Sequence, residues 1–205
     1  MKAAPQNFWH QRFDQPTYFY GIQANDFIRQ AHTQLPTGGR ILSLGEGEGR
    51  NAVFLAEQGF EVTALDGAQS GLDKTQRLAT KKGVQVHTLL ADLQHYEFQD
   101  QAWDGIISVF CHLPPALRIQ VHQSIYASLK PNGVFLLEAY TPQQLHYKTG
   151  GPSNIDLLYK ADDLALELAP LHFKRLSEQV RDIHEGEGHK GASAVVQIIA
   201  KRLVD

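Results

Sequence analysis

The chain has 205 residues, which fits one domain, since domains commonly run to about 100–200 residues. The formal net charge of −3 provides no overall positive field that would attract nucleic acid or anionic lipid. The single cysteine, Cys111, excludes an intrachain disulfide and a cysteine-rich zinc site, and no apolar run approaches the ~18 residues of a membrane helix. With no apolar signal core in Met1–His10, we expect a soluble cytoplasmic protein without nucleic-acid or membrane partners. Its oligomeric state is left open.

The N-terminal segment 1–39 is predicted to form a cap on a core of residues 40–205, the two making a single domain of residues 1–205. Aromatic side chains follow one another closely in this segment: Phe8, Trp9, Phe13, Tyr18, Phe19 and Tyr20. They form either a lid over a ligand or a small satellite core. A helical pattern follows at Ile22, Phe27, Ile28 and Ala31, and Pro36 with Gly38-Gly39 ends it.

From residue 40 onward, short β-type runs alternate with amphipathic helical stretches. Strands are predicted at Arg40–Leu44, Glu61–Leu65, Val84–Leu89, Trp103–Val109 and Val134–Ala139. Helices are predicted at Asn51–Gln58, Ser70–Lys82, Pro114–Leu129 and Ala161–Leu168. The last two runs, His172–His184 and Ala192–Leu203, flank a glycine-rich turn and predict a β-hairpin. The pattern predicts an α/β, Rossmann-like, seven-stranded and mostly parallel sheet with a C-terminal antiparallel hairpin and helices on both faces.

The loop after the first strand carries three glycines, Gly45, Gly47 and Gly49. Glycine permits a sharp turn and a close approach of the backbone to a ligand, although a tight strand-to-helix turn also explains the pattern. The third glycine comes one residue earlier than in the dinucleotide fingerprint G-x-G-x-x-G. Glu46 and Glu48 would repel a pyrophosphate and attract an ammonium and a sulfonium. The loop therefore favours a cationic, amino-acid-like ligand over NAD or ATP.

Acidic residues also follow the second and third predicted strands. Asp66, ahead of Gly67, lies about 20 residues beyond the glycine loop, where a carboxylate can accept hydrogen bonds from two ribose hydroxyls. Asp92 could accept from an adenine amine while the amide of Leu93 donates to a ring nitrogen. Each aspartate alone is explained as a turn or helix-cap residue. Together with the glycine loop they predict a nucleoside site at the carboxyl ends of the strands.

The sequence resembles the class I S-adenosylmethionine-dependent methyltransferases over essentially the whole chain, nearest to the tellurite-resistance and thiopurine methyltransferase group. The segments that carry the resemblance are Phe8-Trp9, Arg12-Phe13, Tyr20-Gly21, Gly45–Asn51, Asp66, Tyr140–Pro142, Gly150–Pro152 and Val195–Gln197. The resemblance implies that S-adenosylmethionine is the cofactor, with Asp66 at the ribose and Asp92 with Leu93 at the adenine. It places Ser108, Val109 and Phe110 at the methionine and sulfonium end, with Trp9 and Tyr20 closing over the cofactor. The implied cofactor-binding residues are Trp9, Tyr20, Gly45, Glu46, Gly47, Gly49, Asn51, Asp66, Gly67, Asp92, Leu93, Ser108, Val109 and Phe110.

One position departs from the family pattern. Many class I enzymes have an aspartate where this chain has Ser43. Glu46 is therefore expected to be the main acidic group near the ammonium of the cofactor.

The methyl acceptor is expected to be a small molecule, such as a thiol, a thiopurine or a metalloid oxyanion. His112, just past the fourth strand, and Arg118, which resembles an arginine near the acceptor site of thiopurine methyltransferases, are the catalytic candidates. A loop histidine and a solvent-facing arginine are the simpler explanations. Cys111 is expected to be a small buried residue, and the stretch His184–His189 a hairpin tip with no metal site. The Gly150–Pro152 loop is expected to cover the acceptor pocket.

Two other functions are compatible with the sequence. A protein that binds S-adenosylmethionine without catalysis is compatible with Ser43 in place of the strand-one aspartate. An NAD-dependent oxidoreductase is opposed by the glycine spacing and by the glutamates of the loop. The absence of an Asn/Asp-Pro-Pro-Tyr/Phe stretch after the fourth strand, where the chain reads Ser108–Pro114, argues against adenine-amino DNA methylation.

Overall fold

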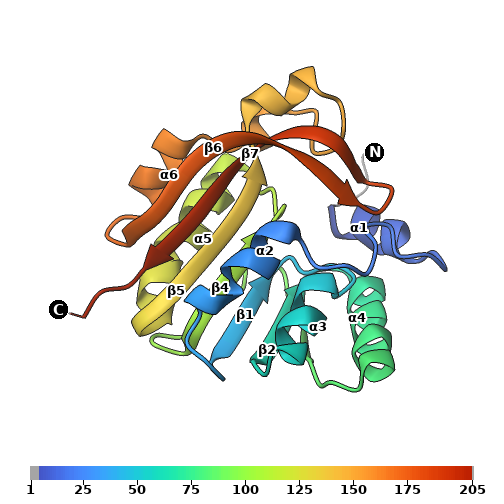
Figure 1. Cartoon of the computed structure of the whole chain (residues 1–205), viewed down its shortest axis with the longest axis horizontal. Coiled ribbons are helices and arrows are strands. Elements are labelled where there is room, and N and C mark those ends of the chain that lie inside the picture. Colours follow the sequence, from blue (N-terminus) through green and yellow to red (C-terminus); the bar gives the residue numbers. More distant parts are fainter. Residues whose placement is uncertain (1–4, 205) are drawn as a thin grey trace.

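The computed structural model describes residues 5–204; residues 1–4 and 205, which the predicted cap and domain ranges include, lie outside the described part. One seven-stranded sheet runs through the molecule in the order β3-β2-β1-β4-β5-β7-β6 (Figure 1). The pairs among β1 to β5 are parallel, whereas β7 is antiparallel to both β5 and β6. The predicted fold class is therefore confirmed. No helix within residues 5–204 is both long and apolar enough to cross a membrane.

Most element bounds lie within a few residues of the predicted ones, but β5 begins at Leu129, five residues before the predicted Val134. The strands are β1 Arg40–Leu44, β2 Glu61–Asp66, β3 His87–Leu90, β4 Trp103–Val109, β5 Leu129–Tyr140, β6 His172–Glu185 and β7 His189–Lys201. The α-helices are α1 Pro5–Phe13, α2 Asp26–Ala31, α3 Arg50–Glu57, α4 Gln69–Lys82, α5 Pro115–Ser128 and α6 Ala161–Glu167. Three short 3-10 helices lie at His32–Gln34, Pro142–His146 and Ile155–Leu157.

The third strand begins three residues later than predicted. Gly83 adopts a left-handed conformation and the amide of Val84 donates to the carbonyl of Ala79, so the end of α4 uses the first part of the apolar run. Val86 packs into the core, but pairing with β2 starts only at His87. An apolar run by itself does not distinguish a strand from a helix terminus that buries the same side chains.

Two apolar layers cover the two faces of the sheet because the strands alternate their side chains. Leu42 and Leu44 of β1 face one cluster, which α5 and α6 complete through residues such as Ile125 and Leu164. Ile41 faces the opposite cluster, formed with α2, α3 and α4. The helices therefore hold the parallel strands in register from both sides, and the carboxyl ends of those strands are left to the loops.

A buried ionic group joins α5 to α6. The Nε and Nη2 atoms of Arg118 donate to the carboxylate of Glu167 at 2.7–3.0 Å, and Nδ1 of His122 lies 2.7 Å from the same carboxylate. Burial would raise the pKa of Glu167, but the hydrogen bonds from His122 and Arg118 hold that pKa below its usual value. The group fixes α6 against the core.

Replacing Glu167 by glutamine leaves the buried Arg118 without its counter-charge, so we expect Glu167→Gln to lower the free energy of unfolding by about 3–5 kcal/mol. Urea denaturation measures the loss. The double variant Arg118→Met, Glu167→Leu removes both charges, so its free energy of unfolding should fall clearly less than that of Glu167→Gln. A single variant as stable as the native chain would contradict the assignment of this pair as a desolvated ion pair.

Candidate active site

The loops that follow β1, β2, β3 and β4 meet at one edge of the sheet. These strands lie side by side in the order β3-β2-β1-β4, and the chain reverses its direction of progress across the sheet between β1 and β4. In open α/β sheets, ligands bind outside the carboxyl ends of the strands at this reversal. The predicted cofactor residues of strands one to four are therefore brought to one edge.

The glycine loop lies in close contact with its neighbours. Gly45 has a φ of 59°, and a Cβ atom there would lie 2.6 Å from Sγ of Cys111, in the loop after β4. Gly49 has a φ of 95°, and its Cβ would lie 2.7 Å from the Cα of Thr75 on α4. Both positions therefore require glycine for conformation and for space. The loop is held between β4 and α4.

Glu46 does not point out of the glycine loop as the sequence analysis expected. One carboxylate oxygen accepts from the amides of Asn51 and Ala52 at 3.0 Å, and the other accepts from the hydroxyl of Ser43. These amides belong to the first turn of α3, which has no backbone acceptor for them. Burial raises the pKa of Glu46. Its observed contacts fix the loop onto α3, and this geometry gives no support to a contact with the cofactor's ammonium.

Glu48 is also neutralised inside the fold. Its carboxylate lies 2.6 Å from Nζ of Lys74, both side chains are almost fully buried, and it accepts from the amide of Tyr20 at 3.2 Å. A neutral pair exerts little long-range field. The argument that two loop carboxylates repel a pyrophosphate is therefore corrected, because the ion pair cancels one of the two charges.

Asp66 ends β2 beside the glycine loop. Its two oxygens accept from the amides of Gly47 and Ala68, each at 2.8 Å, with Gly67 between the strand end and α4. Burial raises the pKa of Asp66 and these backbone hydrogen bonds lower it in part. The amide of Gly67 also contributes a hydrogen bond to this carboxylate, and because two oxygens offer about four lone pairs, acceptor capacity remains after these bonds. This donor and acceptor set fits a pair of adjacent ribose hydroxyls.

Asp92 and Leu93 follow β3, the strand next to β2. Asp92 is partly exposed and accepts from the amide of Gln94 at 3.0 Å, whereas Leu93 is buried in the core. Asp92 therefore lies just past the end of the strand next to that of Asp66, and its role at the adenine stays a prediction. The two acidic side chains and the glycine loop occupy three adjacent strand ends, as the chain order of the motifs predicts.

The N-terminal helix covers the glycine loop. The ring of Phe13 is buried over Gly47, at 3.1 Å from where a Cβ of that glycine would lie. Trp9 stacks on Phe13 with 5.5 Å between ring centroids and lies 6.4 Å from Tyr20. The hydroxyl of Ser70 donates to the carbonyl of His10 at 2.8 Å and attaches α1 to the start of α4. Trp9 and Tyr20 thus pack with Phe13 in an aromatic layer above the loop, and the role of this layer as a lid stays a prediction.

The end of β4 lies among aromatic side chains. Ser108 is buried and Val109 partly buried, and Phe110 adopts a φ of 53°, an uncommon conformation for a bulky residue. The ring of Phe110 stacks on Tyr140 at 4.5 Å and meets His189 at 4.4 Å. The surrounding fold holds Phe110 in this conformation, and such strain is concentrated at functional sites.

Neither catalytic candidate is placed as a general base. Nδ1 of His112 lies 2.7 Å from the carbonyl of Leu157, which makes it the protonated nitrogen, and Nε2 accepts weakly from the amide of Tyr140. Burial lowers the pKa of His112 to about 4, so the ring is neutral. Arg118 is occupied by Glu167 through three hydrogen bonds. Both side chains support the loops around the site.

The sequence analysis did not identify a buried polar network beside this edge. Glu138 of β5 is fully buried and accepts from Arg181, Gln197 and Asn25 at 2.5–3.0 Å. The amide of Asn25 also donates to Oδ1 of Asn51, so the predicted cofactor residue Asn51 links α3 to the cap segment. A glutamate inside the apolar run of β5 was the available signal, since a buried carboxylate needs partners.

The hairpin tip between β6 and β7 overhangs the site. The amide of Glu187 donates to the carbonyl of Phe19 at 2.9 Å, and His189 lies 4.5 Å from Tyr20 between ring centroids. The loop expected to cover the acceptor pocket lies here too, since a Cβ at Gly150 would meet the hydroxyl of Tyr140 at 2.9 Å. Cap, hairpin tip and this loop therefore converge above the ends of β4 and β5.

Comparison with known proteins finds similarity to methyltransferases. Residues 41–133 match the model of a methyltransferase domain. TehB from Haemophilus influenzae superposes with a TM-score of 0.70 at 16 % identity, over 96 % of this chain and 66 % of that one. The chain also shares its fold with a solved S-adenosylmethionine-dependent methyltransferase from Methanosarcina mazei, with a TM-score of 0.68 at 17 % identity, over 86 % of this chain and 98 % of that one. The narrower resemblance to the tellurite-resistance and thiopurine group stays a prediction.

Curated relatives match about half of this chain. The biotin biosynthesis bifunctional protein BioHC of Teredinibacter turnerae is 33 % identical over 54 % of this chain and 22 % of its own length. The ubiquinone biosynthesis O-methyltransferase of Rickettsia felis is 30 % identical over 54 % of this chain and 45 % of its own. The chain thus covers less than half of the length of these relatives.

Cys111 packs against the glycine loop, is partly buried where the sequence predicts a buried residue, and is expected to be unreactive in the folded chain. Burial, aided by the charge of Asp66, raises the pKa of the Cys111 thiol to about 12. Its labelling by Ellman's reagent at neutral pH should be at least about a hundredfold slower than in the denatured chain, whose thiol has a pKa near 8.5. Asp66→Asn should accelerate labelling of the folded protein. Rapid labelling of the native chain would show that the thiol is accessible and ionised.

Proposed function

We propose that this chain transfers the methyl group of S-adenosylmethionine to a small soft nucleophile, such as a thiol, a thiopurine or a metalloid oxyanion. The observation that carries the proposal is the alignment of the glycine loop, Asp66 and Asp92 on three adjacent strand ends. Their order matches an elongated ligand with an amino acid at one end and an adenine at the other. We further propose a cytoplasmic protein that acts without nucleic acid or membrane.

Different residues at this edge of the sheet would bind different parts of the cofactor. Asp66 would accept from the ribose hydroxyls, Asp92 and Leu93 would meet the adenine, and Gly45 would let the methionine end approach the backbone. When bound, the cofactor supplies an electrophilic methyl group on a sulfonium. Trp9 and Tyr20 would exclude water from above, because they lie in the layer that covers the glycine loop.

A soft acceptor suits the absence of a placed base at the two candidate positions. His112 is neutral with a pKa of about 4, and its protonated nitrogen is held by a carbonyl. Thiols ionise near neutral pH without help, whereas a hydroxyl or an amine requires removal of a proton. Positioning and exclusion of water can supply ~7–11 kcal/mol for well-oriented groups. The described geometry is suited to both effects.

Asp66→Asn is expected to weaken binding of S-adenosylhomocysteine by about tenfold or more, since a hydrogen bond to a charged group contributes about 1.5–3 kcal/mol. Isothermal titration calorimetry measures the change. Asp162→Asn, an exposed aspartate at the start of α6, is the matched control and should bind as the native chain does. Equal affinity of the Asp66 variant would remove the ribose role from this residue.

Turnover is tested with a panel of methyl acceptors. Purified protein is incubated with S-adenosylmethionine and small thiols, a thiopurine, selenite or tellurite, and S-adenosylhomocysteine is quantified. We expect release of S-adenosylhomocysteine that depends on at least one of these acceptors. Tight binding of S-adenosylhomocysteine without turnover would indicate a non-catalytic cofactor-binding protein. Thermal stabilisation by NAD instead would overturn both assignments.

A further inference from the structure

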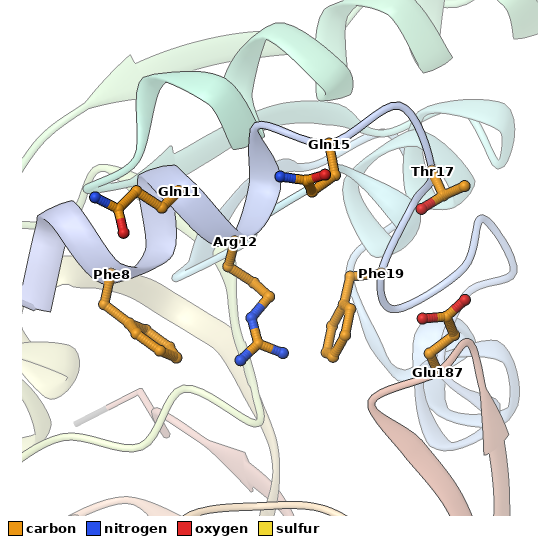
Figure 2. A pocket seen from close by; sticks show the side chains of 7 residues that line it. All are labelled: Phe8, Gln11, Arg12, Gln15, Thr17, Phe19 and Glu187. Atoms are coloured by element: carbon orange, nitrogen blue, oxygen red, sulfur yellow. The ribbon is translucent and has the colours of Figure 1, made fainter.

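A cavity of about 430 Å³ lies beside the N-terminal helix. It is formed by α1, the segment that follows it and the tip of the β6–β7 hairpin (Figure 2). Its lining includes Phe8, Arg12, Gln15, Thr17, Phe19 and Glu187. Ligand pockets commonly have volumes of about 300–1,000 Å³ and combine aromatic walls with a few polar groups. The size and the lining both suit a small organic molecule.

Arg12 is the main donor in this cavity. Its guanidinium lies between two aromatic rings, with Cζ 4.4 Å from the centroid of Phe19 and 5.1 Å from that of Phe8 (Figure 2). Among the described residues, no carboxylate lies within 4.0 Å of this guanidinium. Stacked rings hold the plane of an arginine while its N–H edge stays free for a planar anion. The side chain is thus preorganised to bind a carboxylate or an oxyanion.

The cavity is linked to the acceptor end of the proposed site by a chain of ring contacts. Phe19 lies 4.9 Å from Tyr20, Tyr20 lies 4.5 Å from His189, and His189 lies 4.4 Å from Phe110 at the end of β4. On the same helix, Phe13 covers Gly47 of the glycine loop. The cavity is therefore connected to the end of β4 through three ring contacts, with Tyr20 and His189 between them.

We propose that this cavity recognises the methyl acceptor and that Arg12 binds a carboxylate or oxyanion group of it. The inference rests on the proposed function and narrows its substrate class to small anionic nucleophiles, such as thiol acids. Glu187, on the hairpin wall of the cavity, adds a negative charge that partly offsets the positive charge of Arg12.

The kinetic test compares three small thiols of different charge: 3-mercaptopropionate, 2-mercaptoethanol and cysteamine. In Arg12→Gln, the KM for 3-mercaptopropionate should rise about tenfold or more, and the KM of the neutral and cationic thiols should change little. Arg12→Lys keeps the charge, so its KM for 3-mercaptopropionate should lie between that of the native chain and that of Arg12→Gln. Arg29→Gln removes an exposed arginine of α2 and is the matched control. An equal loss for all three thiols would overturn the proposal.

The binding test does not depend on turnover. Calorimetry with 3-mercaptopropionate, with and without S-adenosylhomocysteine, should show saturable binding to the native chain and binding about tenfold weaker to Arg12→Gln. Absence of binding to the native chain at millimolar concentrations overturns the proposal, even if the protein methylates other acceptors. Failure to bind S-adenosylhomocysteine, in contrast, counts against the proposed function itself.

Arg12 could also bind the carboxylate of the cofactor's methionine. A third experiment distinguishes this carboxylate from the anionic group of the acceptor. S-adenosylhomocysteine carries that carboxylate and 5′-methylthioadenosine lacks it. If Arg12 binds the acceptor, Arg12→Gln binds both nucleosides with native affinity. A selective loss for S-adenosylhomocysteine assigns Arg12 to the cofactor and overturns the acceptor role. Thermal unfolding of each variant verifies that α1 stays folded onto the chain.

Discussion

The buried ion pair between Arg50 and Glu185 joins the glycine loop to the tip of the β6–β7 hairpin. Arg50 begins α3 directly after the glycine loop, Glu185 ends β6 at the hairpin tip, and their charged atoms are 2.6 Å apart. Burial alone would raise the pKa of Glu185, but His189 and Arg50 lower it to about 2. Separating the pair would leave two charges in a water-poor interior, which costs several kcal/mol. The hairpin tip is therefore anchored beside the glycine loop.

The surrounding polar network extends this anchor to the cap and to the sheet. Asn25 donates to both Glu138 and Glu185, at 2.7 and 2.9 Å, so a single side chain joins the cap segment to β5 and to the hairpin. Arg181 pairs with the same two carboxylates. Hydrogen bonds within such a buried network strengthen one another. Cap and hairpin are thereby positioned by the same charges.

This arrangement changes how the electrostatics of the site are understood. The carboxylates of the glycine loop serve the fold, since Glu46 caps α3 and Glu48 pairs with Lys74. Asp66 is the acidic group at the loop that keeps acceptor sites after its backbone bonds are counted. Under the proposed function, recognition of the cofactor would then depend on shape and on hydrogen bonds at the strand ends. Above the site, Arg12 supplies a positive charge of its own.

The order and type of the elements, the parallel sheet with its hairpin, and the placement of Asp66 and Asp92 at adjacent strand ends follow from local periodicity and from one rule of topology. The direction of Glu46, the neutralisation of Glu48 and the partners of Arg118 do not, because each depends on a residue distant in the chain that packs beside it only in the folded molecule. The partners of Glu138 and the aromatic neighbours of Arg12 could not be predicted for the same reason. Sequence spacing determines which strand end a residue occupies, and tertiary packing decides whether its charge faces a ligand or another side chain.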